Sequence, residues 1–207
     1  QLQLVSPKLG NKLRLISFNY VPVIVSGSGS SLDLALCKAL LKSATDAEPN
    51  DSWTSGRFRT SLRTAIETLE LGISDSNLVL ELYEQASKLA EASGHQGLLV
   101  LVDEFGKFLE RTARQKDAPD ILTAQYLAEL ASGLDAPNVL FFVLLHQGFQ
   151  HYASSLSRQQ RVEWAKIQGR FRQVDFNEEP ENLYGLIAAT LVKQDSSKEA
   201  VAAVDEW

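Results

Sequence analysis

Four short apolar segments, separated by stretches with helical periodicity, most constrain how this chain can fold. They are rich in Val, Ile, Leu and Phe, show no clean alternation, and span residues 21–26, 98–102, 139–145 and, more weakly, 172–176. Such runs are typical of strands buried on both faces, as in parallel sheets covered by helices. The sequence therefore predicts an α/β fold, a three-layer domain whose parallel sheet has helices on both faces.

Helical patterns fill the intervals between these strands. Residues 32–41 follow the first strand, 105–114 and 121–134 follow the second, and 181–191 follow the last. Two further amphipathic stripes run from Phe58 to Leu69 and from Val79 to Ala90, so a helical insertion is predicted over about 44–95, opening with a polar loop at 44–56. Because strands alternate with helices, the sheet is expected to be parallel.

Composition and charge exclude several classes of protein. The net charge of −6 gives no support for nucleic-acid binding across the chain. Cys37 is the single cysteine, so an internal disulfide is not possible, and this favours a reducing compartment. Cys37 itself is interpreted as a small buried hydrophobe. No apolar run is long enough to cross a bilayer and no secretion signal opens the chain, so a cytoplasmic protein without membrane contact is expected. The absence of methionine suggests a fragment.

Two adjacent carboxylates, Asp103 and Glu104, directly follow the apolar run at 98–102. In open parallel sheets, ligands bind at the edge formed by the carboxyl ends of the strands. Phosphoryl transfer needs one carboxylate to hold Mg²⁺ and a second group to orient the attacking water. Asp103 suits the metal and Glu104 the water. The alternative is a core strand that ends in a solvated acidic turn.

The run from Leu98 to Glu104 resembles the Walker B strand of P-loop ATPases of the AAA+ and STAND types. The resemblance implies ATP and Mg²⁺ as cofactors, with Asp103 as the metal ligand and Glu104 as the residue that activates water. In such ATPases the next strand ends in a polar sensor of the terminal phosphate, and here that strand is followed by His146 and Gln147. The sequence does not choose between these two residues.

A second resemblance to AAA+ proteins lies in residues 169–176, where a Gly-Arg-Phe stretch precedes the last core strand. In that family an arginine near this place reaches the nucleotide of an adjacent subunit and neutralises charge on the transferred group. Arg170 is the match and Arg172 the second candidate, which implies other subunits or domains as partners. The alternative is that both arginines are ordinary solvated residues.

The phosphate-binding loop of these ATPases, Gly-x-x-x-x-Gly-Lys-Ser/Thr, does not occur in the chain. Residues 27–31 imitate it but lack the lysine, so they are interpreted as a turn with a serine cap on the next helix. The resemblance implies that the loop belongs to a strand upstream of Gln1. Residues 1–180 are then an ATPase core without this loop, and 181–207 begin a helical lid or C-terminal extension.

Two functions from different classes follow. The first is part of an ATP-binding and ATP-hydrolysing motor or switch, inactive as this chain alone; residues 103–110, 145–147 and 163–166 also look like large bacterial ATPases associated with phage defence. The alternative is a degenerate P-loop-like scaffold that acts in protein interaction or regulation. An unrelated α/β metal site would require more acidic or His residues at the other strand ends, where only His146 is available.

Overall fold

The computed structural model describes residues 19–27, 30–47, 53–113, 119–132, 138–148, 151–152, 158–174 and 184. The chain divides into two compact units, residues 1–171 and residues 172–207. The described strands and the helices of eight or more residues belong to the first unit. In the second unit, residues 172–174 and 184 are described and their side chains are exposed.

Three parallel strands form one sheet in the order β1-β2-β3. They are β1 (Tyr20–Ser26), β2 (Gly97–Asp103) and β3 (Val139–Val143), and β2 lies in the middle, with Val23 opposite Val100 and Val100 opposite Phe141. The first three predicted strands are therefore confirmed within two residues. Of the weaker prediction at 172–176, residues 172–174 are not in a strand and the other two lie outside the described residues.

The helices fill the crossovers as predicted. Between β1 and β2 lie α3 (Leu32–Asp46), α4 (Gly56–Glu70) and α5 (Ser76–Ala92), and between β2 and β3 lie α6 (Phe105–Ala113) and α7 (Pro119–Ser132). After β3 comes α9 (Arg158–Gln168), a helix that was not predicted from the sequence. The polar loop was predicted to start at residue 44, but α3 continues to Asp46 because Ala44 is buried on its core side. Apart from Tyr184, the helix predicted at 181–191 lies outside the described residues.

Short polar side chains begin the three helices of the first crossover. Ser31, Ser55 and Asp75 each accept a hydrogen bond from the backbone N–H three residues later, at 3.3, 3.2 and 3.0 Å. Each cap satisfies a donor that the helix leaves unpaired and contributes about 1 kcal/mol. The cap at Ser31 confirms the predicted serine cap on this helix, whereas residues 28 and 29 of the predicted turn lie outside the described residues.

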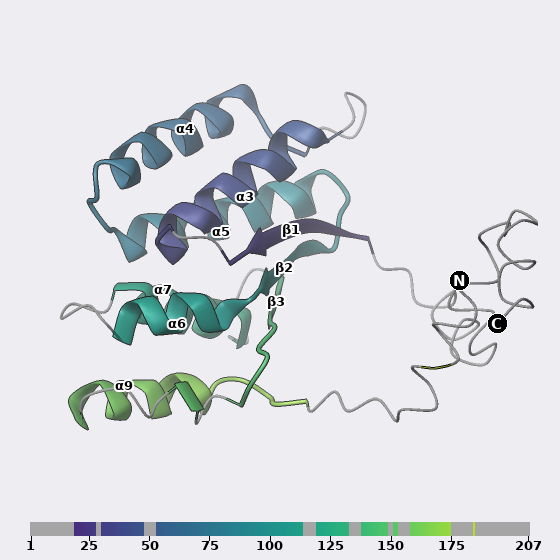
Figure 1. The fold of residues 1–207 in the computed structure, drawn as a ribbon. Coiled ribbons are helices and arrows are strands. Elements are labelled where there is room, and N and C mark those ends of the chain that lie inside the picture. Colours follow the sequence, from purple (N-terminus) through teal and green to yellow (C-terminus); the bar gives the residue numbers. More distant parts are fainter. Residues whose placement is uncertain are drawn as a thin grey trace, which may run out of the picture. The chain divides into compact units, whose positions relative to one another are not determined.

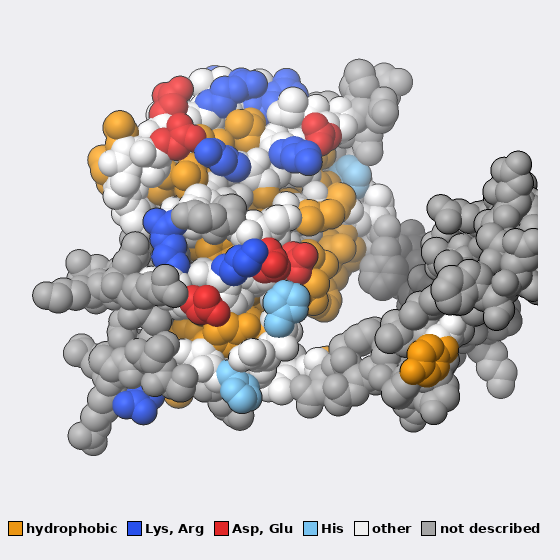
Figure 2. All heavy atoms as spheres, viewed as in Figure 1, with side chains coloured by type: hydrophobic (Ala, Val, Ile, Leu, Met, Phe, Trp, Pro, Cys, Tyr) orange, Lys and Arg blue, Asp and Glu red, His pale blue; other side chains and the backbone are white. Residues whose placement is uncertain are grey.

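The described helices cover one face of the sheet (Figure 1). Helices α3, α5 and α7 pack on β1, β2 and β3, and the valines that point toward them are buried. On the opposite face Ile24 is 64% exposed and Phe142 51% exposed. Figure 2 shows hydrophobic side chains at the surface on the side of the view where Figure 1 places the strands.

The predicted third layer is therefore not among the described elements. The reason is topological: the chain moves from β1 to β2 to β3 in one direction across the sheet, and right-handed crossovers then place every connecting helix on the same face. A helix on the open face would need a crossover that runs in the opposite direction.

A buried carboxylate joins three of the helices. Asp33, in the first turn of α3, is fully buried and accepts hydrogen bonds from Ser74 at 2.5 Å and from Thr123 of α7. The Thr123 hydroxyl also shares a 2.7 Å hydrogen bond with Ser76, the first residue of α5. Since a buried charge is costly without hydrogen-bond donors, this cluster fixes how α3, α5 and α7 meet below the ends of the strands.

A candidate carboxylate site at the end of the sheet

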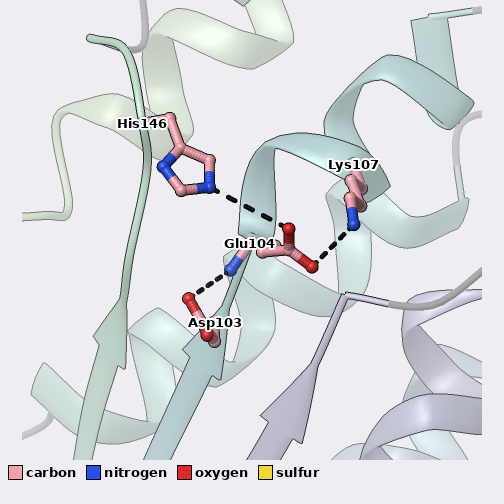
Figure 3. Close-up of polar contacts among 4 residues, drawn as sticks. All are labelled: Asp103, Glu104, Lys107 and His146. Atoms are coloured by element: carbon pink, nitrogen blue, oxygen red, sulfur yellow. Dashed lines mark hydrogen bonds and ion pairs between the residues drawn. The ribbon is translucent and has the colours of Figure 1, made fainter. Parts of the chain in front are cut away.

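The carboxyl ends of β1, β2 and β3 meet at one edge, as parallel strands require (Figure 3). Backbone hydrogen bonds extend this contact beyond the strands. Gly27 donates to the Asp103 carbonyl at 3.0 Å, Leu144 donates to Val102 at 2.9 Å, and Phe105 donates to Leu144 at 3.0 Å. The segments that follow all three strands are therefore held beside the two predicted carboxylates.

Glu104 occupies a sharp turn between β2 and α6. Its φ of 52° lies in the left-handed region, which non-glycine residues rarely adopt. Its amide nitrogen donates to the side-chain Oδ1 of Asp103 at 2.8 Å, and its carbonyl accepts from Lys107 N–H at 2.9 Å. The Asp103 carboxylate thus stabilises the turn that presents the Glu104 carboxylate. Residues with strained backbone of this kind are concentrated at functional sites.

Two basic side chains approach the Glu104 carboxylate (Figure 3). Lys107 Nζ lies 2.6 Å from Oε2, and His146 Nε2 lies 3.9 Å from Oε1. The hydrogen bond from Lys107 lowers the pKa of the Glu104 carboxyl below its usual value. Lost hydration raises this pKa, and the charges of Lys107 and His146 lower it further. Glu104 is accordingly held as an anion near neutral pH, the form in which a carboxylate accepts a proton or orients water.

The site lies at the surface. The Glu104 side chain is one-third exposed and the His146 side chain is largely exposed. Figure 2 shows acidic, basic and histidine side chains gathered near the middle of the view, next to hydrophobic ones. A ligand can therefore reach the carboxylates directly from solvent.

Asp103 is the residue that the sequence predicts to hold a divalent metal. In the described part of the chain, no group of three or more His, Cys, Asp or Glu side chains is arranged to hold a metal ion. Mg²⁺ differs from zinc in this respect, because it keeps several waters and usually takes one or two carboxylates together with substrate phosphates. Asp103 fits such an ion when a phosphate supplies further oxygens, and it does not form a metal site by itself.

The structure brings together some of the predicted site residues and leaves others apart. Asp103, Glu104 and His146 meet at the sheet edge, and Gln147 follows His146 with an exposed side chain. Arg170 instead pairs with Glu129 of α7 in the same unit. Arg172 is the first residue of the second unit and is exposed.

Two residues at the site were not predicted from the sequence to act there. Lys107 stands three positions after Glu104, and side chains three positions apart are neighbours on a helix. The helix that begins at Phe105 was therefore the sequence signal from which the contact could have been predicted. Gly27 was interpreted only as part of a turn, and its contact with Glu104 joins residues 77 positions apart.

Comparisons with protein-family models, with curated proteins and with solved structures find no match to this chain. Within the described ranges, no helix is long and apolar enough to cross a membrane. The fold is α/β, with a three-stranded parallel sheet flanked by helices, and its functional interpretation depends on the site itself.

Proposed function

We propose that this chain is part of an ATP-binding and ATP-hydrolysing domain that works as a motor or switch. The observation that carries the proposal is the pair of carboxylates at the carboxyl end of the central strand, with Glu104 held as an anion beside the end of the neighbouring strand. This is the place in a parallel sheet where phosphate ligands bind, and the two carboxylates match the two tasks of phosphoanhydride hydrolysis.

Each residue has a distinct role in this proposal. Asp103 holds Mg²⁺, which when bound neutralises charge on the phosphates. Glu104 orients the attacking water and accepts its proton, because its carboxylate is anionic and open to solvent. His146 or Gln147, at the end of β3, contacts the terminal phosphate; the 3.9 Å approach of His146 to Glu104 supports His146 in particular.

Lys107 restrains the proposed base. Its ammonium occupies one oxygen of the Glu104 carboxylate at 2.6 Å, so this pair must loosen before Glu104 can accept a proton on that oxygen. A bound triphosphate offers Lys107 a more highly charged partner. Substrate binding would thereby release the carboxylate.

The free edge of the sheet at β3 leaves room for one more strand, and such a strand could carry the phosphate-binding loop that these residues lack. Among the described strands β3 pairs only with β2, and on the face without described helices the side chains of Ile24 and Phe142 are more than half exposed. A strand added parallel to β3, whose connecting helix returns over the open face to β1, satisfies the right-handed crossover rule. The turn after such a strand would lie beside His146 and Gln147.

Arg170 and Arg172 remain candidates for an arginine that acts on the nucleotide of a neighbouring subunit. Arg170 pairs with Glu129 within its own unit, an exchangeable ion pair because both side chains are more than one-third exposed. The association with phage defence remains a proposal based on sequence resemblance alone.

The decisive test compares ATP hydrolysis with Mg²⁺ by the full-length protein and its Glu104→Gln variant. Glu104→Gln should lower kcat about 100-fold or more, since general-base catalysis contributes ~10²–10⁴-fold, and should still bind ATP. Glu110→Gln, an exposed glutamate of α6 that no site contact uses, is the matched control and should keep full activity. Wild-type protein that neither binds nor hydrolyses ATP would favour the alternative, a P-loop-like scaffold for protein interaction or regulation.

A further inference from the structure

Gly27, the residue after β1, has no room for a side chain. A Cβ atom built there would lie 2.7 Å from the Cβ of Glu104, 2.8 Å from its carbonyl oxygen and 3.3 Å from the carbonyl oxygen of Asp103. Real Cβ atoms essentially never come within 3.0 Å of another heavy atom. The backbone of β1 therefore lies directly against the turn that presents Glu104.

Neither side of this contact can easily withdraw. Gly27 N–H donates to the Asp103 carbonyl at 3.0 Å, which extends the pairing of Ser26 with Asp103 by one residue. Val25 is buried in the core two residues earlier, so β1 is anchored. On the other side, Glu104 is fixed by the Asp103 side chain and by the start of α6.

We infer that Gly27 is a positioning residue for Glu104: the bare backbone after β1 lets Glu104 occupy its left-handed turn and aim its carboxylate over the end of the sheet. That Glu104 acts as a base rests on the proposed function. That Gly27 sets the position of Glu104 rests on the geometry alone. It assigns to Gly27 a task that differs from phosphate binding, because the residue acts through Glu104 and needs no ligand of its own.

The inference predicts a specific change when a methyl group is added. Gly27→Ala must displace the Glu104 backbone, since the atoms that the methyl group meets belong to Cβ and the main chain and not to a flexible side-chain end. A displacement of about 1 Å at a catalytic group lowers turnover by up to ~10²-fold. Substrate binding should change far less, because Glu104 acts on water and not on the nucleotide.

The first measurement uses kcat and KM for MgATP in the full-length protein. Gly27→Ala should lower kcat by about 10- to 100-fold with KM within about threefold. Gly56→Ala is the matched control, because Gly56 starts α4 and a Cβ there meets nothing within 4 Å. Equal kcat values for Gly27→Ala and wild type would overturn the inference.

A second measurement is independent of turnover, so it separates this inference from the proposed function. Carboxyl NMR titration of Glu104 should show a raised pKa in Gly27→Ala, because the displaced carboxylate loses Lys107, and no change in Gly56→Ala. If Gly27→Ala does not fold, the double variant with Glu104→Gly should regain a folding transition, since the contact with the Glu104 Cβ is removed and a glycine at position 104 lets the turn shift away from the remaining contact with its carbonyl oxygen. An unchanged titration, or a Glu104→Gly change that stabilises Gly27→Ala no more than it stabilises wild type, would show that Gly27 does not position Glu104.

Discussion

Lys107 Nζ lies 2.6 Å from Oε2 of Glu104, and this ion pair spans the turn at which the central strand of the sheet becomes a helix. Because Glu104 is the proposed base, the partner that holds it also sets when it can act. Removing Lys107 therefore tests the electrostatics of the site without changing the carboxylates.

Lys107→Met should raise the pKa of the Glu104 carboxyl toward its ordinary value, because its largest stabilising contact is lost. A carboxylate whose folded-state pKa is lowered contributes stability above its unfolded pKa, and that stability is lost as the pH falls through the folded pKa. The variant should consequently be less stable than wild type near neutral pH, and the difference should disappear as the pH falls through the folded-state pKa of Glu104, as seen in NMR titration and in unfolding at several pH values. Lys88→Met, which breaks an exposed pair with Glu84, is the control and should leave the Glu104 titration unchanged.

Replacing Glu104 by glycine should stabilise the fold while it removes the proposed base. A non-glycine residue in the left-handed region costs about 1 kcal/mol, which Gly avoids. We expect Glu104→Gly to raise the free energy of unfolding by about 0.5–1 kcal/mol in urea titrations. Glu110→Gly, inside α6, should instead lower it by about 1 kcal/mol. A loss of stability in both variants would mean that the turn at Glu104 is not strained.

Asp33→Ala should be among the most destabilising single changes. It leaves the buried Thr123 hydroxyl and that of Ser74 without their common acceptor, at a cost of about 3 kcal/mol. Asp46→Ala, at the exposed end of α3, should stay within about 0.5 kcal/mol of wild type. Chemical denaturation of both variants checks this, and equal stabilities would show that the buried cluster does not hold the helices together.

Cys37 should make the fold sensitive to alkali. Burial, with a smaller contribution from the charge of Asp33, raises the pKa of its thiol from 9.0 to about 12. Above pH 9 the thiol therefore binds fewer protons in the unfolded chain than in the folded chain. From this thiol alone, wild type should lose about 1.4 kcal/mol of stability between pH 8 and pH 10. Cys37→Ala should show a shallower decline in urea titrations at the two pH values. Identical slopes would contradict the buried thiol as the cause.

Arg170 and Glu129 offer a test of action between subunits. Their ion pair is partly exposed, so Arg170→Ala and Glu129→Ala should each change stability by less than about 1 kcal/mol. If Arg170 acts on a neighbouring nucleotide, only Arg170→Ala should lower kcat in the assembled protein. Equal activities of the two variants would mean that Arg170 serves the ion pair alone.

Much of the fold could be predicted from local patterns. Three strands, the helices between them and the serine cap before α3 were all placed correctly, because periodicity and capping depend on neighbours in sequence. How the sheet is covered does not follow from local patterns, and the second layer of helices that the sequence predicts is not among the described elements. An apolar run such as residues 21–26 looks the same whether a second layer of helices is present or not, and the direction of the crossovers decides that.

By itself, the sequence determined that Asp103 and Glu104 end a buried parallel strand, since both facts follow from residues that stand next to one another. Only the tertiary structure decided which side chains surround them. His146 approaches because β3 pairs with β2, and Gly27 because β1 ends against the turn. Lys107 is the exception, because it is a local neighbour on the helix that starts at Phe105. Strand register and close packing are long-range properties, so contacts between residues tens of positions apart arise only when the sheet assembles.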